Sequence, residues 1–346
     1  MRKIIVDVMG GDRGVAEAVG GVALAAKELE AELILVGDRG EIEAAAGSCG
    51  LSLEGMNVIH TPVAINMEDS PMSVIHAKSD SSMSMGLRLL AEGGGDAFVS
   101  TGNTGALFTG ANLIVRKVSG VRRPAIAALL PMQPPVLLLD SGANISVTPE
   151  NLEHFALMGS AYMKKVHGLT SPRVGLLNNG AEPTKGTELQ QNTYRLLASE
   201  PTLNFVGNVE GNRVMQDVCD VLVTDGFSGN ILLKTMEGMG RLMLTSLKDV
   251  FYSNIRTKLA AGMIQGQLAG MKKKFDAGEY GGAPILGIAK PVIKAHGASD
   301  AKALKNAVRQ AIVYCDADLT GEIAEALRQN TARRRAEVAA TEKEKD

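Results

Sequence analysis

The stretch RVGLLNNGAEPTKGTELQQNTYRLLAS, residues 173–199, contains the unit that decides the fold. Its first residues form an apolar run typical of a buried strand, and its last residues have the spacing of an amphipathic helix. Between them, residues 178–188 contain two glycines, one proline and a single lysine, Lys185. A strand that passes through a glycine loop into a helix is the repeating unit of parallel α/β sheets.

The same alternation recurs along most of the chain. Runs typical of strands occupy residues 3–8, 32–37, 57–61, 96–101, 135–140, 173–178, 204–209, 220–225 and 291–295. Amphipathic stretches occupy residues 14–30, 81–92, 104–118, 150–166, 186–199, 229–250 and 299–328. This pattern predicts a mostly parallel sheet with helices on both faces, interrupted at 125–139 by an antiparallel hairpin. We expect a single α/β domain over 1–330, built as one lobe or two, and a charged tail over 331–346.

Composition excludes several classes of protein. The chain has 346 residues, a net charge of −2, no Trp and only 3% aromatic residues, so neither a basic footprint nor stacking rings point to nucleic acid. Its three cysteines are far apart and match no zinc spacing, which is typical of reduced thiols. The N-terminus resembles a strand rather than a signal peptide, and no apolar run approaches the length of a membrane span. We therefore expect a soluble intracellular protein.

Polar, glycine-rich loops follow six of the expected strands. They lie at residues 7–14, 100–106, 139–144, 178–188, 224–230 and 294–300. If the strands are parallel, the six loops share the edge at which α/β sheets bind ligands. None contains GxGxxG or GxxxxGK[ST], so a small anion such as phosphate or carboxylate is expected rather than a nucleotide. Each loop taken alone is equally well explained as a tight turn.

Three side chains in these loops are candidates for chemistry. Lys185 would supply a fixed positive charge, unless it is an ordinary solvated lysine. Asn230 would donate its amide to an oxyanion, unless it caps the following helix. His296 is the histidine that lies in a strand-end glycine loop. No GxSxG turn and no Cys–His pairing is present, which indicates that the attacking atom comes from a substrate. His154 and His167, thirteen residues apart, do not form a metal pair.

The ordered set of motifs resembles the phosphate acyltransferase family of bacterial phospholipid synthesis. The resemblance extends from residue 4 to about residue 330 and is carried by IIVDVMGGD (4–12), SDSSM (79–83), DAFVSTGNTGAL (96–107), RPAIAALLP (123–131), LDSGAN (139–144), VGLLNNGAEPTKGTE (174–188), FVGNVEG (205–211), VLVTDGFSGN (221–230), YGGAPILGI (280–288) and VIKAHGASDAKALKNA (292–307). The chain departs from the family at Arg13-Gly14-Val15, where His-Ala-Pro is usual, and at His76 and Ser79, where Arg and Lys are common.

The resemblance implies a three-layer α/β/α sandwich similar to isocitrate and isopropylmalate dehydrogenases, assembled as a homodimer. It implies transfer of a long-chain acyl group from acyl carrier protein to inorganic phosphate, without a cofactor. The resulting acyl phosphate would feed a membrane glycerol-3-phosphate acyltransferase. Lys185 and Asn230 are the expected catalytic residues. Phosphate binding is expected from Gly10, Gly11, Asp12, Gly102, Asn103, Thr104, Asn144, Gly229 and His296.

A helical stretch at 236–275 follows the last of these catalytic motifs. Its second half is apolar at Leu259, Met263 and Ile264 and is flanked by cations, including Lys272 to Lys274. This composition fits a helix lying at a membrane surface, and it fits a helix pair in a dimer interface equally well. The family resemblance favours the membrane, and with it a cytoplasmic protein held peripherally at the inner face of the cell membrane.

Two other functions compete with this interpretation. An NAD-dependent decarboxylating dehydrogenase would share the architecture, but it needs a nucleotide site and clustered metal-binding aspartates. A membrane adaptor without enzymatic activity would use the 250–275 helices and leave the polar loops without a role. Titration with cofactor tests the first, and phosphate-dependent release of carrier thiol tests the second.

Overall fold

The computed structural model describes residues 1–268, residue 270 and residues 281–343. Eleven strands form one sheet in the order β3-β2-β1-β4-β11-β10-β5-β6-β9-β7-β8. The strands are β1 (Arg2–Asp7), β2 (Ala31–Gly37), β3 (Asn57–His60), β4 (Ala97–Ser100), β5 (Ala125–Leu130), β6 (Val136–Leu139), β7 (Arg173–Asn178), β8 (Asn204–Glu210), β9 (Val221–Val223), β10 (Ala283–Leu286) and β11 (Val292–Lys294).

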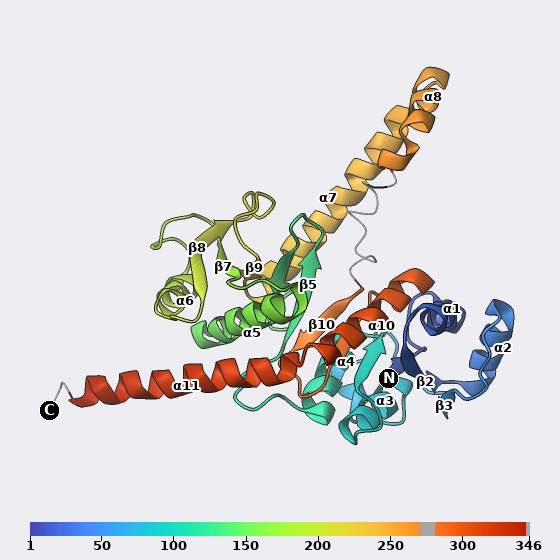
Figure 1. Ribbon diagram of the computed structural model, residues 1–346, viewed down its shortest axis with the longest axis horizontal. Coiled ribbons are helices and arrows are strands. Elements are labelled where there is room, and N and C mark those ends of the chain that lie inside the picture. The colour runs from blue at the N-terminus through green and yellow to red at the C-terminus, as the bar shows by residue number, and fades with distance from the viewer. Residues whose placement is uncertain (269, 271–280, 344–346) are drawn as a thin grey trace.

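Helices cover both faces of this sheet. The helices are α1 (Gly14–Glu28), α2 (Arg39–Cys49), α3 (Ser82–Ala91), α4 (Thr104–Gly110), α5 (Pro149–His167), α6 (Glu188–Ala198), α7 (Gly226–Tyr252), α8 (Ile255–Met263), α10 (Ala301–Asp316) and α11 (Leu319–Lys343), with short turns η1 (Pro71–Val74) and η2 (Ala111–Val115). Residues of α1, α2, α5, α6, α10 and α11 pack in one apolar cluster, whereas α3, α4 and α7 pack on the opposite face. The three-layer α/β/α prediction is confirmed (Figure 1).

The apolar strands divide their side chains between the two layers. In β1, Ile4 and Val6 belong to one core cluster and Ile5 belongs to the other, and all three side chains are fully buried. Successive residues of a strand point to opposite faces, so a strand covered on both sides must be apolar throughout. The continuous run at residues 4–6 therefore encodes a central strand rather than a surface one.

The sheet consists of two parallel blocks that run in opposite directions. We call β3-β2-β1-β4-β11 the β1 half and β6-β9-β7-β8 the β9 half; neighbouring strands are parallel within each half. Between the halves, β10 is antiparallel to β11 and to β5, and β5 is antiparallel to β6. Three successive reversals make the β9 half antiparallel to the β1 half, so the carboxyl ends of the two halves lie at opposite edges.

The local predictions were mostly correct, with three exceptions. The hairpin at 125–139 is confirmed as β5 and β6, whose strands pair from Leu130–Val136 to Ala127–Leu139. The strand β10 and the helix α2 were not predicted. The stretch 299–328, expected as one helical unit, forms parts of α10 and α11, because Asp318 between them adopts a left-handed conformation with φ of 46°.

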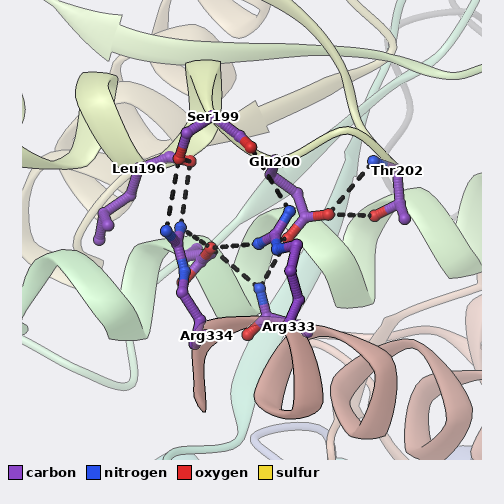
Figure 2. A network of polar contacts seen from close by, with 8 residues as sticks. Leu196, Ser199, Glu200, Thr202, Arg333 and Arg334 are labelled. Carbon is purple, nitrogen blue, oxygen red and sulfur yellow. Dashed lines mark hydrogen bonds and ion pairs between the residues drawn. The ribbon is translucent and has the colours of Figure 1, made fainter. Parts of the chain in front are cut away.

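The C-terminal helix α11 is fastened to the body by a buried polar network. Glu153 of α5 and Glu200, just after α6, are both nearly inaccessible to solvent. Asn330 of α11 donates to both carboxylates, at 2.9 and 2.7 Å, and Arg333 and Arg334 form ion pairs with them (Figure 2). The charged stretch that begins at residue 331 thus continues α11 as far as Lys343, and residues 344–346 lie outside the described residues.

Helices α7 and α8 project from the body as an arm (Figure 1). The 27-residue α7 begins at the carboxyl end of β9, and its side chains Leu232, Leu233 and Met236 pack on the sheet. Beyond this contact, Met239, Leu242, Met243 and Val250 are all more than half exposed. A protruding helical pair was predicted over 236–275; α7 and α8 occupy this range from residue 236 to residue 263, and residues 269 and 271–275 lie outside the described residues.

Candidate functional site

The six polar loops do not share one edge of the sheet. The loops that contain Gly10 to Asp12, Gly102 to Thr104 and His296 follow β1, β4 and β11 at one edge. The loops with Asn144, Lys185 and Asn230 follow β6, β7 and β9 at the opposite edge. The expectation of a single edge was wrong, because β10, which was not predicted, adds the antiparallel pairings that turn the β9 half against the β1 half.

At the β1 edge, three loops pack closely against one another. The backbone N–H of Asp12 donates to the carbonyl of Gly297 at 3.0 Å. A Cβ at Gly11 would lie 2.5 Å from Thr101 Oγ1, and one at Gly10 would lie 3.0 Å from the Ile65 carbonyl, at a φ of +77°. Glycine is therefore required at both positions for packing, and it leaves backbone exposed where the loops meet. The structure brings Gly10, Gly11 and Asp12 together with Gly102 and the His296 loop.

Asn103 at this edge already uses both ends of its side-chain amide. Its Oδ1 accepts from the N–H of Ala106 at 3.0 Å and caps α4. Its Nδ2 donates to the carbonyls of Asn66, Met67 and Asp69. This side chain is nine-tenths buried, while that of Thr104 is exposed. Asn103 therefore shapes the loop, and Thr104 is free to meet a ligand.

Beneath these loops lie two buried ionisable side chains that the sequence did not single out. Lys294 at the end of β11 donates from Nζ to the carbonyls of Thr101 and Ala295, and burial lowers its pKa to about 8. Asp7 at the end of β1 accepts from Ser100 Oγ at 2.8 Å, and burial raises its pKa to about 6. Both residues are the last of a strand, and this position could have marked them in the sequence. Residue type alone does not show whether such a side chain holds loops together or binds a ligand.

At the β9 edge, Asp140 organises the loop that follows β6. Its fully buried carboxylate accepts hydrogen bonds from the backbone N–H groups of Ile126, Gly142, Ala143 and Asn144 and from Asn144 Nδ2. Asn144 Nδ2 also donates to the carbonyl of Pro124 at 2.8 Å. The predicted binding residue Asn144 is thus a fixed structural donor, and its own carbonyl accepts from the N–H of Gly226, the first residue of α7.

Asn230 lies in the first turns of α7, next to this loop. The helix cap is Asp225, whose carboxylate accepts from Ser228 N and Oγ at 2.8 Å, so Asn230 does not act as the cap. A Cβ at Gly229 would lie 2.0 Å from the Asp140 carbonyl, so only glycine allows α7 to start this close to β6. This packing places Asn230 against Gly142 with its side chain exposed. In the described part of the chain, its amide makes no hydrogen bond.

Lys185 lies in the loop after β7, the strand beside β9. The loop is fixed by side chains around it: Asn178 Nδ2 donates to the carbonyl of Lys185 at 3.2 Å, and Asn208 Nδ2 donates to that of Glu182 at 2.8 Å. The stem of Lys185 lies on Gly180, where a Cβ would meet its Cγ at 2.7 Å. Lys185 is exposed, and among the described residues it has no ion-pair partner.

Helix α7 links the two edges of the sheet. Lys234 lies one turn beyond Asn230 and therefore on the same side of the helix. The positive charge of Lys234 is close enough to Lys294 and His296 to contribute to lowering the pKa of both side chains, although burial is the larger cause in each case. The first turns of α7 thus carry Asn230 at the β9 edge and Lys234 toward the loops of the β1 edge.

The end of the arm is apolar and exposed. Leu259 and Met263 on α8 are 68% and 85% exposed, and Ile264 after the helix is 37% exposed. Arg256 and Lys258 supply positive charge on the same helix, whereas Lys272 to Lys274 lie outside the described residues. No helix in the described part of the chain is both long and apolar enough to span a membrane.

The described residues contain neither a candidate metal site nor a disulfide. They contain no group of three or more His, Cys, Asp or Glu side chains placed to hold a metal ion. Cys49, Cys219 and Cys315 are free thiols, and burial raises the pKa of Cys315 to about 11 and that of Cys219 to about 12. These two thiols are protonated at neutral pH and therefore weak nucleophiles.

The architecture is an α/β/α sandwich that several solved structures share. A phosphotransacetylase from Streptococcus pyogenes superposes with a TM-score of 0.58 at 17% identity, covering 94% of both chains. A 4-hydroxythreonine-4-phosphate dehydrogenase from Klebsiella pneumoniae gives 0.56 at 12% identity, covering 91% of this chain and all of the other. At such identities the likeness establishes the fold alone.

Sequence similarity identifies the family. The model of a family described as fatty acid synthesis protein matches residues 2–321. A phosphate acyltransferase from Thermoanaerobacterium thermosaccharolyticum is 42% identical over 322 residues, covering 93% of this chain and 95% of the relative. One from Bacillus subtilis is 42% identical over 315 residues, covering 89% and 93%. The chain belongs to this fatty acid synthesis protein family, which confirms the resemblance described above.

Proposed function

We propose that this chain transfers a long-chain fatty acyl group from acyl carrier protein to inorganic phosphate. A phosphate oxygen attacks the thioester carbonyl, the new C–O bond forms and the C–S bond breaks. The products are an acyl phosphate and the free carrier thiol, which leaves as a thiolate and then takes a proton. Family membership and the name phosphate acyltransferase carried by relatives over most of their length support this assignment.

The observation that carries the assignment of roles is a contrast among three asparagines. Asn103 and Asn144 use their amides to hold the fold, whereas the exposed amide of Asn230 is unused in the described part of the chain. A donor fixed by a helix and left unsatisfied is suited to a charge that develops during reaction. We therefore assign Asn230 to the tetrahedral oxyanion.

Lys185 provides the positive charge in this proposal. Its loop follows β7, two strands away from the Gly142 loop after β6, which corresponds to roughly 10 Å at ordinary strand spacing. The phosphate would lie along the first turns of α7, between Asn230 and the β1-edge loops that contain Gly10, Gly102 and His296. An ammonium without a carboxylate partner can stabilise the phosphate and the developing oxyanion without first breaking an ion pair.

Single substitutions test these roles. Asn230→Ala and Lys185→Ala should each lower kcat about 100- to 1000-fold, because each removes one preorganised charge or donor. The measurement is phosphate-dependent release of carrier thiol at saturating substrates. Lys27→Ala, at an exposed lysine of α1, is the matched control and should behave as wild type. Wild-type turnover by either site variant would refute its assigned role.

The arm and the assembly complete the proposal. We propose a homodimer in the cytoplasm, whose arm tips contact the inner face of the cell membrane through Leu259, Met263 and Ile264. An exposed apolar tip with adjacent cations supports membrane contact, and a greasy product gives the contact a purpose. The membrane glycerol-3-phosphate acyltransferase would receive the acyl phosphate there.

Flotation with anionic liposomes tests the membrane contact. Leu259→Asp with Met263→Asp should reduce the floated fraction, because two carboxylates oppose both insertion and attraction to the anionic surface. Asp substitution of the exposed apolar pair Leu113 and Met215, away from the arm, is the matched control. Equal flotation of tip variant and wild type would exclude this surface. Light scattering of the wild-type protein without liposomes measures its oligomeric state and tests the dimer.

A further inference from the structure

The segment Arg116–Arg123, which we call the basic segment, precedes β5 and concentrates positive charge. It contains Arg116, Lys117, Arg122 and Arg123 and no Asp or Glu, in a chain whose net charge is −2. All four cationic residues are exposed. Basic composition of the whole protein therefore does not explain this concentration.

The charges of the basic segment are poorly balanced by the protein itself. Within the described residues, none of its four cations forms an ion pair; Lys117 Nζ donates instead to the carbonyl of Arg122 at 3.0 Å. Glu150 is the carboxylate that senses the charge of Arg122. The two residues line a hollow of about 720 Å³ whose other carboxylate, Glu153, is already paired with Arg334. A net positive surface thus faces solvent.

Hydrogen bonds connect the basic segment to the candidate catalytic asparagine. Arg123 is followed by Pro124, whose carbonyl accepts from Asn144 Nδ2 at 2.8 Å. The Asn144 carbonyl in turn accepts at 2.7 Å from Gly226, which begins the helix bearing Asn230. The end of the basic segment therefore lies at the β9 edge, where the helix bearing Asn230 begins.

An exposed apolar residue follows Asn144, the residue that is hydrogen-bonded to Pro124. Ile145 follows Asn144 directly and is 71% exposed. Ile145 and Arg123 are thus the chain neighbours of the two residues joined by this hydrogen bond. Arginine and a central apolar contact within a polar rim are typical of protein–protein interfaces. This arrangement distinguishes the surface from a scatter of solvated cations.

We propose that the basic segment, with Ile145 at its border, is the docking surface for a carboxylate-rich face of the protein that carries the acyl thioester. The proposal rests on the function proposed above, which requires a protein donor. Such a donor must be held by its surface while its flexible thioester arm reaches Asn230, and the adjacent β9 edge satisfies that requirement. Complementary charge accelerates encounter and fixes orientation, and salt screens it.

The test is Arg122→Glu with Arg123→Glu, assayed with two acyl donors. With acyl carrier protein, KM should rise about tenfold at low ionic strength, and the difference from wild type should shrink as salt is added. With acyl-pantetheine, a small thioester without a protein surface, kcat and KM should equal those of wild type, as should KM for phosphate. Lys27→Glu with Arg88→Glu changes the charge equally at exposed positions of α1 and α3 and serves as the control.

The outcomes separate the two proposals. Unchanged KM for acyl carrier protein in a variant with wild-type thermal stability overturns the docking surface, as does an equal loss with both donors. An equal effect of the control pair overturns it too, because net charge would then be the cause. Weaker binding to anionic vesicles without a change in KM would assign the surface to lipid instead. Absence of phosphate-dependent turnover in the wild type would refute the proposed function itself.

Discussion

The most demanding test of the site's construction is a single methyl group at Gly229. This residue lies in the first turn of α7, immediately before Asn230, where an added Cβ would lie 2.0 Å from the Asp140 carbonyl oxygen and 2.9 Å from Thr224 Cγ2. Ordinary contacts begin at 3.4 Å. The Asp140 carbonyl belongs to the backbone, and the Asp140 carboxylate is held by several N–H groups. Asp140 therefore does not move away easily, and the start of the helix must move instead.

Gly229→Ala should therefore displace the start of α7 by roughly 1 Å and cost about 1–3 kcal/mol of stability through overpacking. Because Asn230 is the next residue, it moves with the helix. A misplacement of this size at a reacting centre costs about 100-fold in rate. We expect kcat to fall by that factor while the protein remains folded at 25 °C. Steady-state release of carrier thiol and urea denaturation measure the two effects.

The same helix offers a matched control. A Cβ at Gly238 meets nothing within 4 Å, so Gly238→Ala should keep wild-type turnover and stabilise the helix by roughly 0.5–1 kcal/mol. Wild-type kcat in Gly229→Ala would show that the position of Asn230 does not limit the reaction. Loss of stability without loss of kcat would separate the helix contact from the chemistry and remove Asn230 from the oxyanion role.

Other predictions concern the supports of the site and the C-terminal helix. Burial lowers the pKa of His154 from 6.5 to about 4, so the unfolded chain binds this proton first as the pH falls below 6.5. About 3 kcal/mol of unfolding free energy should therefore be lost by pH 4. His154→Gln should reduce this dependence of the unfolding free energy on pH, as measured by urea denaturation. Glu200→Gln removes the nearer of the two buried carboxylates that pair with Arg333 and should cost about 1.5–3 kcal/mol by chemical denaturation, because charge-assisted hydrogen bonds are lost while Glu153 remains; a loss below about 1 kcal/mol would refute the role of this network in anchoring α11. Asp140→Asn turns an amide N–H₂ toward N–H donors, so it should cost at least about 2 kcal/mol and lower turnover with both protein and small donors.

The architecture could be predicted because its signals are local. Strands buried on both faces read as apolar runs, and the strand–glycine–helix units recur at regular intervals. The direction of the β9 half could not be predicted in the same way. It depends on β10, four residues at 283–286 that pair with the nearby β11 and, across a large sequence separation, with β5. A short strand of this kind carries little pattern, yet it decides at which edge each loop lies.

For the candidate site, residue type and position predicted which loops are polar, but not which side chains remain free to bind a ligand. Asn103, Asn144 and Asn230 all follow strands in glycine-rich loops, and sequence gives no way to rank them. In the structure, the first holds the 66–69 loop and caps α4, and the second joins Pro124 to Asp140. Which asparagine remains free depends on which backbone groups lie nearby, and those contacts exist only after folding.

The reversal of the sheet changes what α7 has to do. If all six loops lay at one edge, the helix after β9 would be one wall among several. Because the edges are opposite, the first turns of α7 connect them, with Asn230 at the β9 edge and Lys234 close to His296. The same helix extends beyond the body toward the exposed tip at Leu259 and Met263. Under the proposed function, the continuous helix α7 therefore fixes the distance between the acyl-transfer site and the surface that receives its product. Shortening the exposed part of α7 by whole turns should leave turnover in solution intact and reduce it only where delivery to a bilayer is measured.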